Sequence, residues 1–437
     1  MKIGIDISSL QGLHRMRGIG YVTNHFIKNI PNQSPDTFVF YIYKNGRKII
    51  DKEILKNISL ESSDYEVRCM SPPNDKRGEF TGRLKYLFKS FSKPKTLASY
   101  ILGSHKYGNV KDLDAFIQLD QSEPLARLRK GAKNYFIAYD LIPYVLEKDY
   151  LWGYHTARLN GKKRLGAIKC VVKRYMYIWK LKINTKKAHK VIAISKATKY
   201  DFEKILKVPS KKIEVISLGI DNTSAQNKKI NSDGLVDRYY YTPWGYITKR
   251  DSLKNVDFLL FVGGVDPRRK LDDVVTAFNH LRGQGKDIKL VLSGDVMKGP
   301  LVIDTEPVRK ALLDSSYYDD IYFLGFTSDE KRDWLYSKAL AFIFPSIYEG
   351  VGLPVLEAMR YHTPVIAYDN KAVREVAGDC PIYANDPLSI VEAVKKLLSY
   401  KEKEINKLTD KAYYQSLKYT WGKTAKSILE IVSGDKS

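Results

Sequence analysis

One stretch of sequence decides the fold of this chain: residues 344–359, which have the sequence FPSIYEGVGLPVLEAM. An apolar run from Ala339 to Pro345 ends here and has the length of a buried strand, while Pro354 opens a segment with helical periodicity. Gly350 and Gly352 lie between the two and leave the backbone open to a ligand. Because the free N–H groups at a helix start attract anions, this junction predicts a phosphate-binding turn.

Two glutamates, Glu349 and Glu357, border this turn. The block that they enclose resembles the signature of retaining glycosyltransferase family four, whose members have the GT-B fold and carry two glutamates separated by seven residues. The similarity extends over nearly the whole chain, although its specific part is this block. The other segments that are similar to the family are Ile3–Asp6, Arg17–Gly20, Phe258–Leu271, Thr363–Ala367, Arg374–Asp379 and Trp421–Ala425.

This resemblance implies an α/β protein of the GT-B fold, with two Rossmann-like parallel-sheet domains that face a cleft and a C-terminal helix that crosses back to the N-terminal domain. The length agrees, because 437 residues exceed one ordinary hydrophobic core. Short apolar runs alternate with helical stretches in both halves, as in parallel sheets covered on both faces. The predicted strands are 2–8, 38–43, 65–70, 115–119, 135–139, 191–195, 213–217, 258–263, 289–293, 321–324, 341–344 and 365–368.

The predicted domains are 1–220 on the acceptor side, 221–256 as an interdomain link with a surface excursion, 257–410 as the nucleotide-sugar-binding domain and 411–437 as the crossover helix. The link is polar and irregular, apart from the sequence YYYTPW at 239–244. We interpret these aromatic residues as a packed hairpin, and contact with an acceptor or a membrane interface is the alternative.

The resemblance also implies roles for the residues that would bind a nucleotide diphosphate sugar. Glu349 would orient or polarise the hydroxyls of the sugar, and Glu357 would bind the ribose diol. Arg268 and Arg269 follow a glycine turn, where guanidinium groups can take phosphate oxygens and stabilise the leaving group; a solvated basic turn is the alternative. Some family members have a further arginine at the position of Gly264, so part of the phosphate clamp is missing. The remaining predicted donor contacts are Gly263, Gly264, Lys270, Phe326, Gly350, Val351, Gly352 and Leu353.

Two further segments are candidates in the first half of the chain. Gly18 and Gly20 are predicted to flank a turn that approaches the reacting sugar or the diphosphate, with a simple left-handed turn as the alternative. Tyr139 stands where many members of the family have a histidine beside the sugar. Because a tyrosine can donate a hydrogen bond but is no base at neutral pH, we expect Tyr139 to position the substrate, with Asp140 as the nearer polar candidate or as a strand-end cap.

Metal or redox chemistry is not expected. The sequence Asp112-Leu113-Asp114 matches the aspartate pair of metal-dependent transferases, but it precedes a predicted strand, where capping or solvation explains it better. Cys69, Cys170 and Cys380 are far apart and lack metal-ligand spacing, so we interpret them as free thiols. We therefore predict no metal and no cofactor.

The composition, 44% hydrophobic and 28% charged, is that of a soluble globular protein, and no apolar run approaches the roughly 20 residues of a membrane-spanning helix. Met1 leads directly into a predicted strand rather than a signal peptide, so we expect a cytoplasmic protein.

The positive charge is unevenly distributed. Lys plus Arg number 73 and Asp plus Glu 49, a net charge of +24, yet the window from Tyr150 to Tyr200 contains no acid. Leu165, Ile168, Val172, Tyr175 and Trp179 recur there at helical spacing between basic residues, and the segment 76–95 also mixes cations with aromatic residues. One interpretation is a helix whose apolar stripe packs in the core while its charges meet an anionic membrane. The other is an ordinary core helix with a solvated outer face.

Together these features predict a retaining, metal-independent hexosyltransferase, peripheral at the inner face of the plasma membrane, that moves a hexose from a nucleotide diphosphate sugar to a polyprenyl-linked or other saccharide acceptor in bacterial surface glycan synthesis. A non-catalytic GT-B subunit is the alternative, favoured by the departures at Tyr139 and Gly264. Nucleic acid is not expected as a partner, because the basic window contains no nucleic-acid motif. The base, sugar, acceptor, linkage and oligomeric state stay open.

Overall fold

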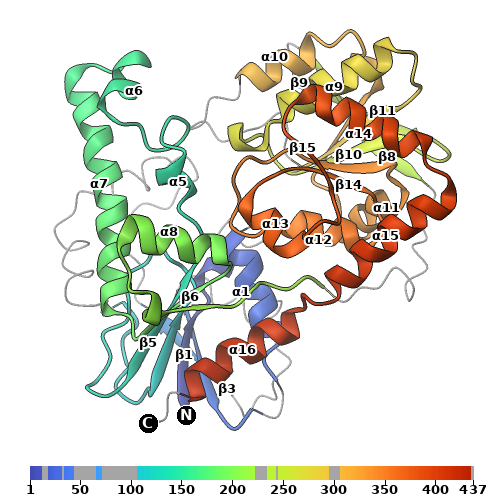
Figure 1. The fold of residues 1–437 in the computed structure, drawn as a ribbon. Coiled ribbons are helices and arrows are strands. Elements are labelled where there is room, and N and C mark those ends of the chain that lie inside the picture. Colours follow the sequence, from blue (N-terminus) through green and yellow to red (C-terminus); the bar gives the residue numbers. More distant parts are fainter. Residues whose placement is uncertain are drawn as a thin grey trace. The chain divides into compact units, whose positions relative to one another are not determined.

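The computed structural model describes residues 1–11, 18–31, 34–43, 65–70, 106–221, 234–242, 245–294 and 306–434. The chain forms two compact units, which are described separately below (Figure 1). The amino-terminal unit comprises Met1–Gly219 together with Thr420–Ser437, and the carboxyl-terminal unit comprises Ile220–Tyr419.

The amino-terminal unit is built on a parallel seven-stranded sheet in the order β3-β2-β1-β4-β5-β6-β7. Its central strands are almost fully buried, as expected for a sheet covered on both faces. The strands are β1 (Lys2–Asp6), β2 (Thr37–Tyr43), β3 (Tyr65–Met70), β4 (Ala115–Gln118), β5 (Lys133–Ala138), β6 (Lys190–Ala193) and β7 (Ile213–Val215).

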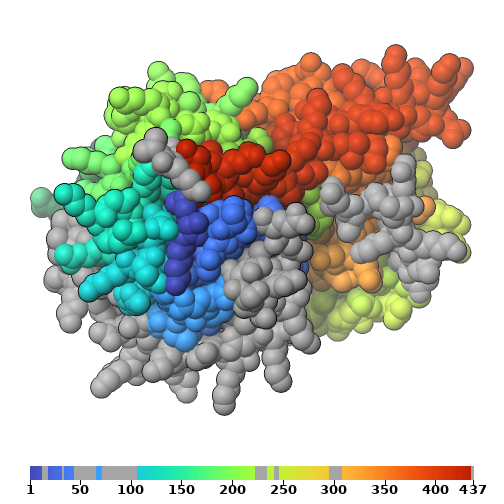
Figure 2. Space-filling view, turned by 90° about the horizontal axis from the view of Figure 1, so that it is seen from below, coloured from blue at the N-terminus to red at the C-terminus, as the bar shows by residue number. Residues whose placement is uncertain are grey.

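The described helices of this unit include one from the far end of the chain. Trp421, the first residue of α16, packs its ring against Tyr21 and His25 of α1. Figure 2 shows α16, in red, lying across the blue amino-terminal residues. The helices are η1 (Ser8–Gln11), α1 (Gly18–Lys28), α5 (Ile142–Val145), α6 (Tyr154–Leu159), α7 (Arg164–Lys187), α8 (Lys196–Leu206), η4 (Ser210–Lys212) and α16 (Trp421–Gly434).

The carboxyl-terminal unit has an eight-stranded sheet in the order β15-β14-β13-β10-β11-β12-β8-β9, parallel except for the last two strands. The strands are β8 (Leu235–Thr242), β9 (Gly245–Ser252), β10 (Phe258–Val262), β11 (Lys289–Ser293), β12 (Ile321–Gly325), β13 (Ala341–Phe344), β14 (Val365–Tyr368) and β15 (Ile382–Ala384). The helices are η5 (Pro267–Arg269), α9 (Leu271–Gly283), α10 (Glu306–Leu313), η6 (Tyr318–Asp320), α11 (Asp329–Lys338), α12 (Leu353–Arg360), α13 (Lys371–Ala377), α14 (Pro387–Ser399) and α15 (Glu402–Ser416).

The α/β fold class and all twelve predicted strands are confirmed, with bounds that agree within two residues. Strands β8, β9 and β15 are additional to the predicted ones, although the hairpin predicted at 239–244 is confirmed by the antiparallel pairing of β8 with β9. The first two fall in the segment interpreted as a link, and they form a hairpin on the edge of the second sheet, in place of an interdomain link at these positions. Their sequence is polar because an edge hairpin exposes one face to water.

A buried arginine attaches this hairpin to the sheet. The Arg238 guanidinium lies between the rings of Tyr240 and Tyr322, at 4.4 and 4.2 Å from their centroids. Its Nη2 donates to the carbonyls of Asp319 and Ile321, at 2.8 and 3.0 Å. Two aromatic faces and two carbonyls thus compensate for burying the charge.

The end of the second unit is held in a similar way by Arg360 of α12. Its Nε donates to Oγ of Ser416, at 3.0 Å, and its Nη2 to the Ser416 carbonyl, at 2.8 Å. Ser416 is the last residue of α15, and the chain enters the other unit at Thr420. The segment predicted as one crossover helix, 411–437, therefore contains a break between α15 and α16.

Helix α7 corrects the interpretation of the apolar stripe. Its 24 residues span about 36 Å, whereas β5 and β6 are only about 20 and 13 Å long, so the helix is longer than the sheet that it covers. Only the second half, with Ile178 and Leu181, joins the hydrophobic core. Leu165, Ile168, Val172 and Tyr175 are exposed, and the prediction that this stripe packs in the core is wrong for these four residues.

Two remaining predictions concern membranes. The basic segment 76–95 lies outside the described residues. Among the helices that the structure describes, none combines the length and the apolar character needed to cross a bilayer.

Candidate active site

The first part of the site is the loop that follows β10 in the carboxyl-terminal unit. Gly263 has φ +149°, and a Cβ atom added there would lie 1.8 Å from Nη1 of Arg269. The turn continues through η5 to Lys270, whose φ of 46° is left-handed. Asp266 caps η5 by accepting a hydrogen bond from the Arg268 backbone, at 3.3 Å. A glycine at 263 is therefore what allows the Arg269 side chain to lie against the backbone of this loop.

Arg268 connects this loop to the strand–helix turn. Its guanidinium donates to Oε1 of Glu349 in a short ion pair, and to the carbonyl of Tyr348 at 3.2 Å. The backbone N–H of Ile347 donates in turn to the Arg268 carbonyl, at 2.9 Å. Arg268 is only 9% exposed, so its charge depends on Glu349 and on Asp266, whose Oδ2 lies 3.4 Å from Nε.

The turn itself is formed by the glycine-rich segment between β13 and α12. Gly352, with φ +96°, is the N-cap of α12, and Pro354 lies in the first turn. A Cβ atom at Gly352 would lie 3.1 Å from a methyl of Val373, so both conformation and space favour glycine. Asn370 supports the turn by donating to the Ser346 carbonyl, at 2.7 Å. The structure thus confirms the predicted strand–turn–helix arrangement.

Glu357 lies one turn into α12. Tyr336 donates to its Oε2 at 3.1 Å, and Nε of Arg332 is 4.0 Å from the same oxygen. Burial raises the pKa of Glu357, against the lowering effects of Arg332 and the Tyr336 hydrogen bond. The side chain is 18% exposed, which leaves it open to a ligand on one side. A carboxylate held this way can accept two hydrogen bonds from a diol.

The other predicted donor contacts lie in the same unit, with different exposures. Gly350 and Val351 are buried in the turn, whereas Gly264, Lys270 and Leu353 are half-buried. Phe326 follows β12 and is exposed. Nothing in the described structure tests whether any of these residues contacts a donor, so their roles stay predictions.

The amino-terminal unit holds a second polar cluster, at the carboxyl ends of β1 and β4. Asp6 is 2% exposed and accepts hydrogen bonds from Lys106 Nζ at 3.0 Å, the Tyr107 hydroxyl at 2.8 Å and the Ser8 backbone at 2.9 Å. Lys106 also donates to Glu123, at 2.9 Å. Burial alone raises the pKa of Asp6, but Lys106 and the hydrogen bonds outweigh it, so the pKa is lowered and the carboxylate is ionised.

A third carboxylate adjoins this cluster. Asp120, directly after β4, accepts hydrogen bonds from the backbone and hydroxyl of Ser122, at 2.8 and 2.7 Å. Burial, together with the nearby negative charge of Glu123, raises the pKa of Asp120 to about 6. Ligands bind at the carboxyl ends of the strands in open parallel sheets, so this edge is a candidate binding surface.

The predicted residues of the amino-terminal unit lie on or near this edge. Tyr139 follows β5, and its hydroxyl has no hydrogen-bond partner among the described residues. Burial, with a smaller contribution from Asp120, raises the Tyr139 pKa well above its usual value, so the phenol stays protonated. Asp140 accepts from the Ile142 backbone, at 3.1 Å, as a strand-end cap does. Gly18 and Gly20 begin helix α1, in place of the predicted turn flanked by both glycines.

Four residues of this edge were not predicted from the sequence, namely Lys106, Tyr107, Asp120 and Glu123. Two acids directly after a predicted strand were a usable signal for Asp120 and Glu123. Lys106 and Tyr107 could not be recognised from the sequence. They lie about 100 positions from Asp6 and contact it only in the folded chain.

The aspartates at 112 and 114 lie at the opposite edge, before β4. Asp112 pairs with Arg68 at 2.6 Å and with Lys2 at 2.7 Å, and the Arg68 hydrogen bond lowers its pKa. Asp114 pairs with Arg129, at 2.6 Å. These residues serve ion pairs in the structure. Across the described residues, no group of three or more His, Cys, Asp or Glu side chains is arranged to hold a metal ion.

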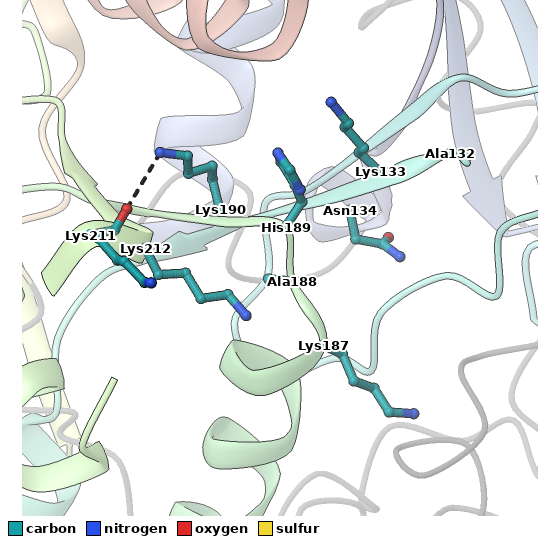
Figure 3. A pocket seen from close by; sticks show the side chains of 9 residues that line it. All are labelled: Ala132, Lys133, Asn134, Lys187, Ala188, His189, Lys190, Lys211 and Lys212. Carbon is teal, nitrogen blue, oxygen red and sulfur yellow. Dashed lines mark hydrogen bonds between the residues drawn. The ribbon is translucent and has the colours of Figure 1, made fainter. Parts of the chain in front are cut away.

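A cavity of about 580 Å³ also lies at this opposite edge, at the amino ends of β5, β6 and β7. Figure 3 shows that its cations do not converge: Lys133 and Lys187 point in different directions, and Lys190 reaches the Lys211 carbonyl, at 3.5 Å. Lys190 also pairs with Glu214, at 2.8 Å. The cavity is thus separated from the Asp6 cluster by the length of the sheet.

Comparison with known sequences finds a family match in the second half of the chain. The family model described as "Glycosyl transferases group 1" matches residues 247–415, which contain the loop after β10 and both glutamates. The second half of the chain thus matches the group 1 glycosyl transferases. This match confirms the resemblance that the Glu349–Glu357 block predicts.

Curated relatives match over shorter segments. The chain is 29% identical over 134 residues to O-antigen chain mannosyltransferase B of Escherichia coli, which is 29% of this chain and 32% of the relative. It is 37% identical over 92 residues to O-antigen chain mannosyltransferase RfbU of Salmonella typhimurium, which is 21% of this chain and 26% of the relative. The matched segments thus span about a third or less of the length of these two relatives.

Solved structures agree on the fold. The structure of Anabaena Alr3699/HepE in complex with UDP and glucose has a TM-score of 0.61 at 14% identity and covers 99% of this chain and 100% of that chain. The glycosyltransferase WaaG, involved in lipopolysaccharide biosynthesis, has a TM-score of 0.61 at 11% identity and covers 99% of this chain and 100% of that chain. The chain therefore has the GT-B fold, with two α/β domains.

Proposed function

We propose that this protein is a retaining hexosyltransferase that moves mannose from a nucleotide diphosphate sugar to a lipid-linked or polysaccharide acceptor in bacterial surface glycan synthesis. It works without a metal, in the cytoplasm at the inner face of the plasma membrane. Mannose is chosen because the O-antigen relatives are named as mannosyltransferases. The observation that carries the proposal is the ion pair between Arg268 and Glu349, which joins the two loops of the candidate donor site.

The donor binds at the carboxyl ends of β10 and β13. Its diphosphate meets the backbone N–H groups at the start of α12 and the guanidinium of Arg269, which the Gly263 turn admits. Glu349 orients the hydroxyls of the sugar, and Arg268 holds Glu349 in place. Glu357 accepts hydrogen bonds from both hydroxyls of the ribose diol. That structures related in fold hold UDP and UDP-glucose supports a donor of this class.

The acceptor binds at the carboxyl edge of the amino-terminal sheet, where the side-chain oxygens of Asp120 and Glu123 accept hydrogen bonds from its hydroxyl groups. Lys106 and Asp6 keep this edge rigid through their ion pair. Because Tyr139 stays protonated, it donates a hydrogen bond to the substrate and takes no proton from it.

Transfer then proceeds on one face of the sugar. The bond between the anomeric carbon and the diphosphate oxygen breaks, and the acceptor oxygen bonds to the same carbon from the same side. The acceptor proton passes to the departing phosphate, so no protein base is needed. The cations of the donor site stabilise the negative charge that develops on the diphosphate, so catalysis is mainly electrostatic.

A non-catalytic GT-B subunit that binds nucleotide sugar or scaffolds a partner transferase is the second candidate. Glycine at position 264 favours it, because a cation of the phosphate clamp is missing there. Arg268 does not replace that cation, since it is engaged with Glu349.

One experiment separates the two. The purified protein is incubated with a panel of nucleotide diphosphate hexoses in EDTA, with and without a polyprenyl diphosphate saccharide, and nucleoside diphosphate release is measured. The proposal predicts release that rises with acceptor, needs no metal and is lost in Glu349→Ala, with the donor's anomeric configuration kept in the product. Binding without release by the wild type would favour the scaffold.

A further inference from the structure

The helical hairpin α6–α7 exposes an apolar surface that the fold does not use. Its members are Leu159 at the end of α6, which is 88% exposed, and four residues of α7 that are between 44% and 75% exposed, namely Leu165, Ile168, Val172 and Tyr175. We call these five residues the α7 stripe. The steps of three and four residues place the α7 members on one side of the helix.

Cations surround this stripe. Lys162, Lys163 and Arg164 lie in the connection between the helices and at the start of α7, and all three are exposed. Lys169 is exposed on α7 itself, and Lys173 is half-buried there. Burial lowers the pKa of Lys173, as expected for an ammonium group beside apolar side chains. No acid occurs between Tyr150 and Tyr200 to balance these charges.

Packing, a hydrogen bond and an ion pair hold the α6–α7 hairpin, which carries the stripe, in its conformation. Ala157 of α6 and Ala167 of α7 are fully buried where the two helices contact each other. The connection is closed by Arg158, which donates to the Lys162 carbonyl at 2.9 Å. Arg174 further pairs with Glu147 and lies over the ring of Tyr144, with 4.3 Å to the centroid. The stripe is therefore displayed on the face of α7 that neither α6 nor the core occupies.

We propose that the α7 stripe and its cations dock the protein on an anionic lipid bilayer. Contiguous exposed apolar residues indicate a binding surface, and aliphatic residues flanked by lysines are what the boundary between headgroups and acyl chains accepts. The positive charge around the stripe, together with its aliphatic residues, favours an anionic bilayer over the two other possible partners. A second copy of this chain would bring the same cations against these, and a nucleic acid would leave the aliphatic side chains without a partner.

The inference adds a surface to the proposed function and rests on it only in the expectation that a lipid-linked acceptor is delivered at the same membrane. The docking itself needs no donor and no turnover. A failure of membrane binding and a failure of glycosyl transfer can therefore be observed separately.

The test is flotation of the full-length protein with vesicles of phosphatidylcholine alone and of phosphatidylcholine with 30% phosphatidylglycerol. We expect the wild type to float only with the anionic vesicles, and binding to weaken as salt is raised. The double variant L165E/Y175E should lose at least tenfold in partitioning. The triple variant K162Q/K163Q/K169Q should lose about 100-fold, because each cation near an anionic surface contributes about fivefold, or about 1 kcal/mol.

Matched variants on the other unit control for general changes in polarity. L388E/Y414E alters two residues that are 62% and 67% exposed, and K396Q/K403Q/K407Q removes three exposed lysines. Both controls should float like the wild type. The proposal is overturned if the wild type does not bind anionic vesicles or if the stripe variants float unchanged. It is also overturned if sedimentation shows that the wild type is a dimer and that L165E/Y175E is a monomer.

Discussion

The two candidate binding edges of this chain are built in contrasting ways. In the carboxyl-terminal unit, a loop and a turn each contribute one residue of an ion pair. Arg268 and Glu349 are 81 positions apart, and both lie in segments that carry a sequence motif. In the amino-terminal unit, Asp6 meets Lys106 across 100 positions, and only Asp6 lies in a recognisable segment. The candidate donor edge is thus set by local motifs, whereas the candidate acceptor edge is set by tertiary contacts.

The largest effect is expected from breaking the donor edge at Glu349. Glu349→Ala should lower the transfer rate by about 100- to 1000-fold, because the sugar loses its orienting carboxylate and Arg268 loses its partner. Steady-state release of nucleoside diphosphate measures it. Glu392→Ala, which removes a carboxylate that is 70% exposed on α14, should leave the rate unchanged. A Glu349→Ala enzyme with near wild-type turnover would contradict the assigned role.

The matching perturbation of the acceptor edge is Lys106→Met. It leaves Asp6 buried without its cation and should cost about 3 kcal/mol in the free energy of unfolding. The sign of the pH dependence is specific. The lowered pKa of Asp6 stabilises the wild type above the unfolded pKa near 4, and this stabilisation disappears as pH falls through the folded value. In the variant, burial raises the pKa of Asp6 instead. The loss in the free energy of unfolding should therefore be largest at pH 8 and smallest at pH 4.

Urea unfolding of both proteins at pH 4, 6 and 8 measures this difference. A loss that is the same at all three values would show that Lys106 acts through packing alone. Lys133→Met, at the opposite edge of the same sheet, is the control and should change stability little.

A smaller effect is expected from the glycine that admits Arg269. Gly263→Ala should lower kcat/KM for the donor by about tenfold to 100-fold, because its Cβ displaces the guanidinium from the phosphate position. Gly285→Ala is the matched control: it too has a positive φ, of +76°, but nothing lies within 4 Å of its added Cβ. Donor kinetics of the two variants should therefore separate displacement of Arg269 from backbone strain. Equal losses in both would contradict this reasoning.

The smallest effect is expected at Asp120, whose pKa is raised to about 6. The KM for the acceptor should rise as pH falls below about 6, where the carboxylate becomes protonated, and Asp120→Asn should remove this dependence. Because the ionised form is disfavoured by burial, the variant should also be more stable than the wild type at pH 8, by about 1 to 3 kcal/mol. An acceptor KM that keeps its pH dependence in the variant would assign the titration to another group.

The sequence predicted the fold well, since parallel strands buried on both faces are near-continuous apolar runs, as at 258–262 and 341–344. It predicted the hairpin at 239–244 but missed the length of β8 and β9 and their place in the sheet, because an edge hairpin alternates polar and apolar residues and resembles a loop. It also placed Leu165, Ile168, Val172 and Tyr175 in the core, because periodicity reports that a face is apolar and not what covers it. Arg238 shows the same limit: its burial between two tyrosine rings follows from tertiary packing alone.

The candidate donor residues were predictable for a related reason. A strand end, a glycine turn and a helix start are consecutive in sequence, so the chemistry of Glu349, Gly352 and Glu357 is visible before folding. The support of Glu357 by Tyr336 was not, because the tyrosine comes from α11 and shows no motif.

The most direct test of the central claim is a calorimetric titration of the protein with two nucleotides that differ in their ribose hydroxyls. The nucleoside diphosphate that raises the Tm most is compared with its 2′,3′-dideoxy form, on the wild type and on Glu357→Ala. Our account predicts that the wild type binds the ribose form at least tenfold more tightly and that the variant binds both forms equally. A variant that keeps the preference for ribose, or a wild type without one, would contradict the assignment of the carboxyl-terminal unit as the donor site.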